Sequence, residues 1–195
     1  ENKELWEQTF LVALDLKTGK KIWEKKYNFE TKVVFYLSYS DNVLLATGSL
    51  NEKAEPKISK AKRKYQYNLY AFDSRTGKEI WNTSTRFRAK NDIHHGGYMQ
   101  HPVIMGGKVY QDPYVYDLKT GKKGSLVLKR QGHGCGLLSG CENFMYGRGK
   151  NPRVYYLNKT GSQTLTSITR PGCAINMIPA GGLLLIPEGG SGCAC

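Results

Sequence analysis

Apolar and polar residues alternate over short stretches along the whole chain, and these stretches are separated by glycine, asparagine and aspartate. Residues 11–15 alternate, run into Thr18 and Gly19, and are followed by a second short stretch at 20–23. This arrangement is typical of two antiparallel strands joined by a tight turn. No segment places apolar residues at helical spacing over a useful length. The pattern predicts an all-β protein.

The same hairpin pattern recurs four times. Its glycines are Gly19, Gly77, Gly121 and Gly161, which lie 58, 44 and 40 residues apart. A period of about 40 to 45 residues is typical of β-propeller blades. The longer first step contains a lysine-rich stretch, which we interpret as a surface insertion in a unit of ordinary length.

Two further strand candidates precede each later hairpin, so each unit is predicted to hold four antiparallel strands. The pairs are 33–37 with 43–47, 100–105 with 108–111, 136–138 with 143–147 and, without a following hairpin, 174–178 with 183–187. Glycine pairs such as Gly106 with Gly107 mark tight turns between the first two strands of a unit. Cys141 is expected in such a turn.

The predicted organisation is a single β-propeller segment of about four blade equivalents. It comprises a half blade at 1–32, blades at 33–90, 91–131 and 132–170, and a half blade at 171–195. Two closures are open. The terminal halves could join into a four-bladed ring, or the chain could be an arc of a ring with six to eight blades. We favour the arc.

The hairpin sequence resembles the tryptophan-docking motif of the pyrroloquinoline quinone (PQQ) repeat, Ala-x-Asp-x-x-x-Gly-x-x-x-Trp. Two copies match fully, with Ala13, Asp15, Gly19 and Trp23 in the first and Ala71, Asp73, Gly77 and Trp81 in the second. The third copy has Ser125 in place of the tryptophan, and the fourth has Leu157 for aspartate and Leu165 for tryptophan. The resemblance implies a PQQ-like β-propeller in which these residues are structural, each tryptophan packing between neighbouring blades.

The same resemblance implies two classes of function. The PQQ-like family includes quinoprotein alcohol dehydrogenases, which hold PQQ with a metal ion, and non-catalytic propellers, including an outer-membrane assembly lipoprotein. Proteins of this type are usually extracytoplasmic. We predict a periplasmic or secreted binding and assembly module completed by the remainder of a propeller or by partner chains. The alternative is a segment of a redox enzyme that lines a quinone or metal site at the channel mouth.

The strand scheme gathers the histidines and most cysteines on one face of the propeller. Copper or zinc could be bound by thiolate and imidazole groups there. The candidate metal ligands are His95, His101, His133 and Cys135, and the candidate disulfide residues are Cys135, Cys173, Cys193 and Cys195. Disulfides, a soft-metal site and free thiols remain open alternatives.

The chain is basic, with 29 lysines and arginines against 16 aspartates and glutamates, a formal net charge of +13. The densest cluster, between Lys53 and Lys64, predicts either an acidic partner or a solubilising surface. We expect no nucleic-acid partner. The longest apolar stretch, 181–187, has strand length, so no membrane span is expected. The sequence contains neither a phosphate-binding loop nor a Gly-x-Ser-x-Gly elbow, so it gives no support for phosphate-loop or serine-hydrolase chemistry.

Overall fold

The structure, a computed structural model, consists of β-strands joined by turns in the residues that it describes. These are residues 10–30, 35–49, 64–88, 100–128, 136–159, 161–172 and 177–188. Each strand there pairs antiparallel with its neighbour in the sequence. Across these residues, no helix is long and apolar enough to cross a membrane.

The described strands form five sheets. The first contains β1 (Phe10–Leu14) and β2 (Lys21–Lys26); the second β3 (Phe35–Ser40), β4 (Val43–Ser49), β5 (Lys64–Asp73) and β6 (Glu79–Arg88); the third β7 (Val103–Met105), β8 (Lys108–Gln111), β9 (Tyr114–Asp117) and β10 (Lys123–Val127). The fourth contains β11 (Ser139–Cys141), β12 (Phe144–Gly149), β13 (Asn151–Tyr156) and β14 (Ser162–Thr164), and the last β15 (Ile178–Ala180) and β16 (Leu183–Leu185). The predicted all-β class, with four-stranded antiparallel blades and about four blade equivalents, is confirmed. The blade boundaries stay a prediction.

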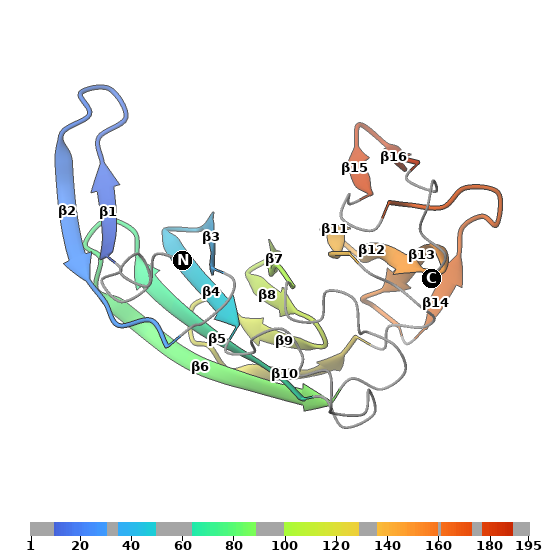
Figure 1. Ribbon diagram of the computed structural model, residues 1–195, viewed down its shortest axis with the longest axis horizontal. Coiled ribbons are helices and arrows are strands. Elements are labelled where there is room, and N and C mark those ends of the chain that lie inside the picture. Colours follow the sequence, from blue (N-terminus) through green and yellow to red (C-terminus); the bar gives the residue numbers. More distant parts are fainter. Residues whose placement is uncertain are drawn as a thin grey trace, which may run out of the picture.

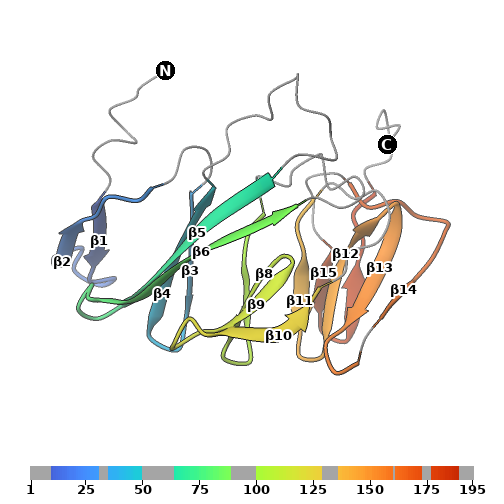
Figure 2. The same cartoon turned by 90° about the horizontal axis from the view of Figure 1, so that it is seen from below.

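The sheets follow one another along an open arc, with β1–β2 at one end and β15–β16 at the other (Figure 1). The view from below shows the same order (Figure 2). The first strand of each four-stranded sheet lies on the inner side of the arc and the last on its outer side. The inner strands β3, β7, β11 and β15 contact one another in turn. This is the arrangement of blades in part of a β-propeller.

The apolar core lies between successive sheets. Alternate residues of a strand face opposite sides of its sheet, so each four-stranded sheet contributes to two clusters. In β4, Ala46 packs towards β1–β2 with Leu11 and Phe72, whereas Leu45 packs towards the third sheet with Val109. A third cluster of the same kind joins the third and fourth sheets. Burial therefore depends on having a sheet on each side.

Two-residue turns join the first two strands of the units. Gly106 and Gly107 have φ of 56° and 69°, and Gly181 and Gly182 have φ of 58° and 77°. Asp41 and Asn42 take positive φ at the corresponding place in the second sheet. Positive φ at both central residues is the type I′ geometry, whose twist matches that of the flanking strands. The glycine turns expected from the sequence are confirmed.

The register of the fourth sheet differs from the expectation at its first strand. The sequence predicted a strand at 136–138, but β11 begins at Ser139, which pairs with Tyr146. Leu138 instead lies over Gly147, where an added Cβ would come within 2.4 Å of the leucine Cδ2. The turn between β11 and β12 contains Glu142, whose φ is 38°, and this turn sets which residues of the two strands pair. Cys141 is therefore the last residue of β11, and its predicted place in the turn was wrong.

The fourth hairpin is also displaced by one residue from its expected alignment. Tyr156 pairs with Phe144 as Asp117 pairs with Lys108. The position of the aspartate is thus occupied by Tyr156, and the expected match to Leu157 was wrong. Leu157 instead packs against the cluster between the third and fourth sheets. Strand pairing decides the alignment here because the local sequence lacks the aspartate that defines the turn.

A tryptophan of one hairpin lies against a glycine of the next sheet's hairpin. The indole N–H of Trp23 donates to the carbonyl of Ser74 at 2.9 Å, and that of Trp81 donates to the carbonyl of Leu118 at 2.9 Å. A Cβ added at Gly77 would lie 2.8 Å from the Trp23 ring. One added at Gly121 would lie 2.6 Å from the Trp81 ring. Only a residue without a side chain permits this approach.

We expect Gly121→Ala to destabilise the protein more than Gly19→Ala, its matched control. Both glycines have positive φ, 69° and 67°, so both changes carry a backbone cost of ~1–2 kcal/mol. An added Cβ at Gly19 meets nothing within 4 Å, whereas at Gly121 it overlaps Trp81, at a further cost of ~1–3 kcal/mol. Urea unfolding of the three proteins measures the difference. Equal losses would show that the indole contact contributes nothing.

Candidate functional site

The turn after each of the first three hairpin strands is organised by an aspartate. Oδ1 of Asp15 accepts the N–H groups of Lys17 at 3.1 Å and Thr18 at 2.7 Å, and the hydroxyl of Thr18 at 2.7 Å. Asp73 and Asp117 accept the same three groups from the residues at the corresponding positions. The turn residues are therefore set by local side-chain to backbone hydrogen bonds.

These hydrogen bonds lower the pKa of all three aspartates below the ordinary value. For Asp15 and Asp117 the largest cause is the threonine hydroxyl in the same turn. For Asp73 the largest cause is the hydrogen bond that the guanidinium group of Arg75 donates to Oδ2 at 3.1 Å. Each donor stabilises the charged carboxylate, so the folded turn favours the ionised form of the aspartate over the protonated form.

The predicted metal and disulfide residues fall mostly outside the described part of the chain. The candidates outside the described residues are His95, His133, Cys135, Cys173, Cys193 and Cys195. Of the metal candidates the structure describes His101, whose Nδ1 lies 2.6 Å from the carbonyl oxygen of Pro102 and whose ring packs edge-on against Tyr36. Among the described residues, no three His, Cys, Asp or Glu side chains come together to hold a metal. The metal and disulfide sites, and the redox alternative, stay predictions.

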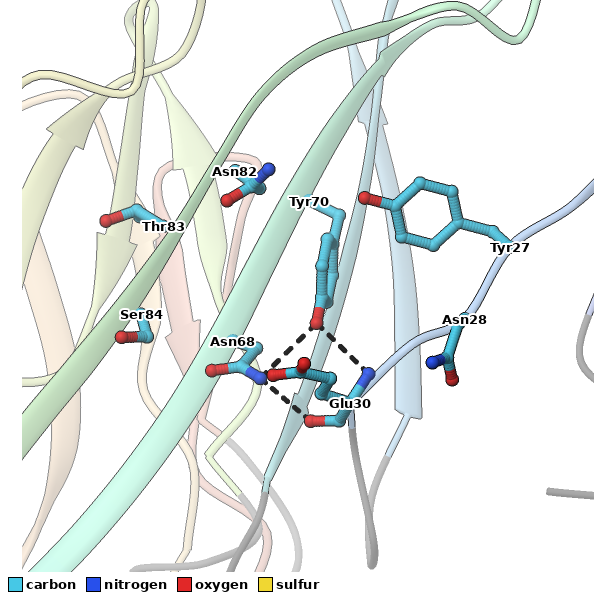
Figure 3. A pocket seen from close by; sticks show the side chains of 8 residues that line it. All are labelled: Tyr27, Asn28, Glu30, Asn68, Tyr70, Asn82, Thr83 and Ser84. Atoms are coloured by element: carbon cyan, nitrogen blue, oxygen red, sulfur yellow. Dashed lines mark hydrogen bonds between the residues drawn. The ribbon is translucent and has the colours of Figure 1, made fainter. Parts of the chain in front are cut away.

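A polar pocket lies between the segment that follows β2 and the outer half of the second sheet (Figure 3). Its volume is about 320 Å³. The lining residues are Tyr27, Asn28 and Glu30 from the segment, Asn68 and Tyr70 from β5, and Asn82, Thr83 and Ser84 from β6. Among the lining residues that the structure describes there is no lysine or arginine, although the chain as a whole is strongly basic. The charged side chain described in the lining is the carboxylate of Glu30.

Hydrogen bonds hold the segment against β5. The backbone N–H of Glu30 donates to the hydroxyl of Tyr70 at 3.1 Å, and Nδ2 of Asn68 donates to the carbonyl of Glu30 at 2.8 Å. Nδ2 of Asn68 also lies 3.3 Å from the Tyr70 hydroxyl (Figure 3). These contacts join residues about 40 positions apart in the sequence and give the pocket one fixed wall.

The carboxylate of Glu79 fixes two of the lining side chains by hydrogen bonds. It accepts the hydroxyl of Tyr27 and, at 2.6 Å, Nδ2 of Asn82. Burial, and then the hydrogen bond to Glu79, raise the pKa of Tyr27. Burial also raises the pKa of Tyr70. Both tyrosines therefore stay neutral at ordinary pH and present hydroxyl groups rather than phenolates.

One acceptor of the lining has no partner. Asn68 is 4% exposed, and its Oδ1 makes no hydrogen bond. The carbonyl of Glu30 can only accept, so the amino group of Asn68 must face it and Oδ1 must point the other way. Figure 3 shows this oxygen directed towards the side of the pocket where Ser84 lies. An unsatisfied buried acceptor costs ~1–3 kcal/mol.

Sequence reasoning did not identify this pocket. Its one local signal is Asn68, because asparagine is disfavoured inside strands and here stands between Tyr67 and Leu69 in β5. The remaining lining residues are ordinary strand and loop residues in the sequence. They are brought together by the pairing of β5 with β6 and by the path of the segment after β2.

The fold and the turns define the class: an arc of a β-propeller whose hairpins resemble the PQQ repeat in sequence. No family model matches the sequence, and no curated protein matches it. The chain is similar to the crystal structure of BamB from Moraxella catarrhalis, with 13% identity over 78% of this chain and 42% of that one, at a TM-score of 0.48.

A second similar structure is the quinohemoprotein alcohol dehydrogenase ADHIIG from Pseudomonas putida HK5. The identity is 21% over 64% of this chain and 19% of that one, at a TM-score of 0.37. The matches thus span less than half of either solved chain. They assign neither an activity nor a partner to this protein.

We expect the stability of the protein to fall as the pH drops from about 5 to about 2. A carboxyl whose folded pKa is depressed contributes stability above its unfolded pKa of ~3.9, and this is lost as pH falls through the folded pKa. In the triple variant D15N/D73N/D117N the amide oxygens still accept hydrogen bonds but do not titrate. Its unfolding free energy should change less over this range, as followed by urea unfolding at each pH.

The matched control is D41N, which changes an aspartate in the β3–β4 turn. Its slope of unfolding free energy against pH is the reference with which the slope of the triple variant is compared. A triple variant with an unaltered slope of unfolding free energy against pH would contradict the role given to the three hairpin aspartates.

Proposed function

We propose that this chain is a binding and assembly module: a β-propeller segment that acts outside the cytoplasm as part of a larger protein or complex. The observation that carries the proposal is the exposed apolar surface of the inner strand β3, on the face directed towards β1–β2. There, further strands would complete the blade to which β1 and β2 belong.

The uncovered surface lies on the face of the second sheet that is directed towards β1–β2. Leu37 pairs with Ala46, and Tyr39 pairs with Leu44, so all four side chains share one face. Ala46 and Leu44 pack in the cluster with β1–β2. Leu37 and Tyr39 remain 52% and 62% exposed. The two-stranded sheet covers the middle of its neighbour and leaves the inner strand bare.

The sheets at the two ends of the arc each have an uncovered apolar face. In β1–β2, Leu11 faces the second sheet, and the alternate residues Phe10, Val12 and Leu14 are 57%, 39% and 58% exposed. In β15–β16, the exposed residues that share a face are Ile178, Leu183 and Leu185. Contiguous apolar surface of this kind marks a site of association.

The strand edges point to the same kind of partner. In the described residues, β1 pairs only with β2, and β16 pairs only with β15. The unpaired edge of β1, on the inner side of the arc, and the unpaired edge of β16 therefore offer backbone N–H and C=O groups to an added strand. The occupant that fits is a pair of antiparallel strands with alternating apolar residues, from the remainder of a propeller or from a partner chain.

The extracytoplasmic location rests on the resemblance of the hairpins to the PQQ repeat. The five cysteines are compatible with an oxidising compartment. An acidic partner at the loop between Lys53 and Lys64, which lies outside the described residues apart from Lys64 itself, remains part of the proposal.

We expect Leu37→Asp to weaken assembly with the completing strands by about 10- to 100-fold. Burying a leucine contributes ~1.5–3 kcal/mol, and a charge in its place would be desolvated without a partner. The matched control is Leu16→Asp, because Leu16 is fully exposed at the tip of the β1–β2 turn, away from the bare inner strand. Sedimentation velocity of the intact protein or complex, isolated from its source, measures the assembled fraction.

Both leucines already contact water, so neither variant should lower the unfolding free energy of the chain by much. Hydrogen exchange gives a second readout: amides at the unpaired edges of β1 and β16 should exchange more slowly in the assembly than in the isolated chain. Unchanged assembly in Leu37→Asp, with no added protection at either edge, would refute the proposal.

A further inference from the structure

We propose that the polar pocket between residues 27–30 and strands β5 and β6 is a binding site for a neutral saccharide unit. This site is separate from the bare inner strand beside β3, and it does not depend on assembly. The proposal stands on the composition of the lining, on the unpartnered buried acceptor and on the charge of the site.

The lining matches the hydrogen-bonding character of a sugar. A sugar hydroxyl donates one hydrogen bond and accepts others, and the amide and hydroxyl side chains of Asn28, Asn82 and Ser84 do both. Most small-molecule pockets are lined mainly by hydrophobic and aromatic side chains; here polar side chains predominate, so a ligand rich in hydroxyl groups fits better than an apolar one. The tyrosine rings of Tyr27 and Tyr70 add apolar surface for the C–H groups of a sugar ring.

The buried amide oxygen of Asn68 requires a donor. Its amino group is already committed to the carbonyl of Glu30, and its oxygen points towards the side of Ser84 without a partner. A hydroxyl donor placed there would satisfy the oxygen. The side chain is held by two hydrogen bonds before any ligand arrives, so little ordering is needed on binding.

Charge and size narrow the ligand class. Glu30 contributes a carboxylate to the lining, and the carboxylate of Glu79 lies behind Tyr27 and Asn82, so these two negative charges disfavour phosphorylated and acidic ligands. A volume of about 320 Å³ is at the lower end of the range for small-molecule pockets. It accommodates a single sugar ring, which could be the terminal unit of a longer glycan.

The test is nuclear magnetic resonance titration of the full chain with methyl glucoside, methyl mannoside, methyl galactoside and N-acetylglucosamine, with glucuronate as the anionic probe. We expect at least one neutral probe to shift the side-chain amide signals of Asn68 and Asn82 with a millimolar Kd, and glucuronate to bind more weakly.

Two variants test where the ligand binds, and a third variant is the control. Ser84→Ala removes an exposed hydroxyl at the pocket and should weaken binding about three- to tenfold, the effect of one hydrogen bond. Asn68→Leu removes the unpartnered acceptor and should weaken it at least about tenfold. Ser125→Ala changes an exposed serine on β10, the outer strand of the next sheet, and should leave the Kd unchanged.

The fold of each variant is checked by its thermal unfolding. Should Asn68→Leu fail to fold, Ser84→Ala still decides the matter, because Ser84 is exposed and holds no described contact within the core. The proposal is overturned if none of the neutral probes shifts the amides at concentrations up to about 50 mM. It is also overturned if Ser84→Ala binds as the unchanged protein does, or if glucuronate binds best.

Discussion

The contact between an indole ring and a glycine backbone is the constraint on which the packing of the first three sheets of this arc depends. Trp23 and Trp81 each reach across to the hairpin of the next sheet, where Gly77 and Gly121 leave room for the ring. The aspartate turn presents the glycine at positive φ, and a carbonyl in the same turn accepts the indole N–H. Turn chemistry and sheet packing are thus coupled, because the local hydrogen bonds that shape the turn also create the surface that the next tryptophan covers.

This mode of packing makes each sheet dependent on its neighbours. A four-stranded sheet buries apolar residues on both faces, so an arc has uncovered apolar surface wherever a sheet is narrow or a neighbour is missing. Leu37 and Tyr39 illustrate the first case, and the outer face of β1–β2 illustrates the second. The exposed apolar side chains and the open strand edges coincide, which connects the proposed assembly function to the packing rule of the fold.

The polar pocket arises from the same geometry. The segment after β2 crosses the outer half of the second sheet on its way to the inner strand β3, and polar groups line the space between them. Asn68 ties that segment to β5 through its amino group and leaves its oxygen for a ligand. The bare inner strand and the pocket lie on the same face of one sheet, yet they differ in chemistry: apolar on the inner side and hydrogen-bonding on the outer side.

The sequence by itself determined the features that rest on local chemistry. Alternation of period two predicted the strands, glycine pairs predicted the tight turns that the structure shows to be of type I′, and the spacing of Gly19, Gly77, Gly121 and Gly161 predicted blade-sized units. Only the tertiary structure decided the register of β11, the place of Tyr156 in the fourth hairpin and the pocket around Asn68. These features depend on hydrogen bonds between strands and on contacts between residues far apart in the chain, such as Glu30 with Asn68. A local pattern is silent about them because the same residues would suit several pairings, and the pairing is selected by burial across whole sheets.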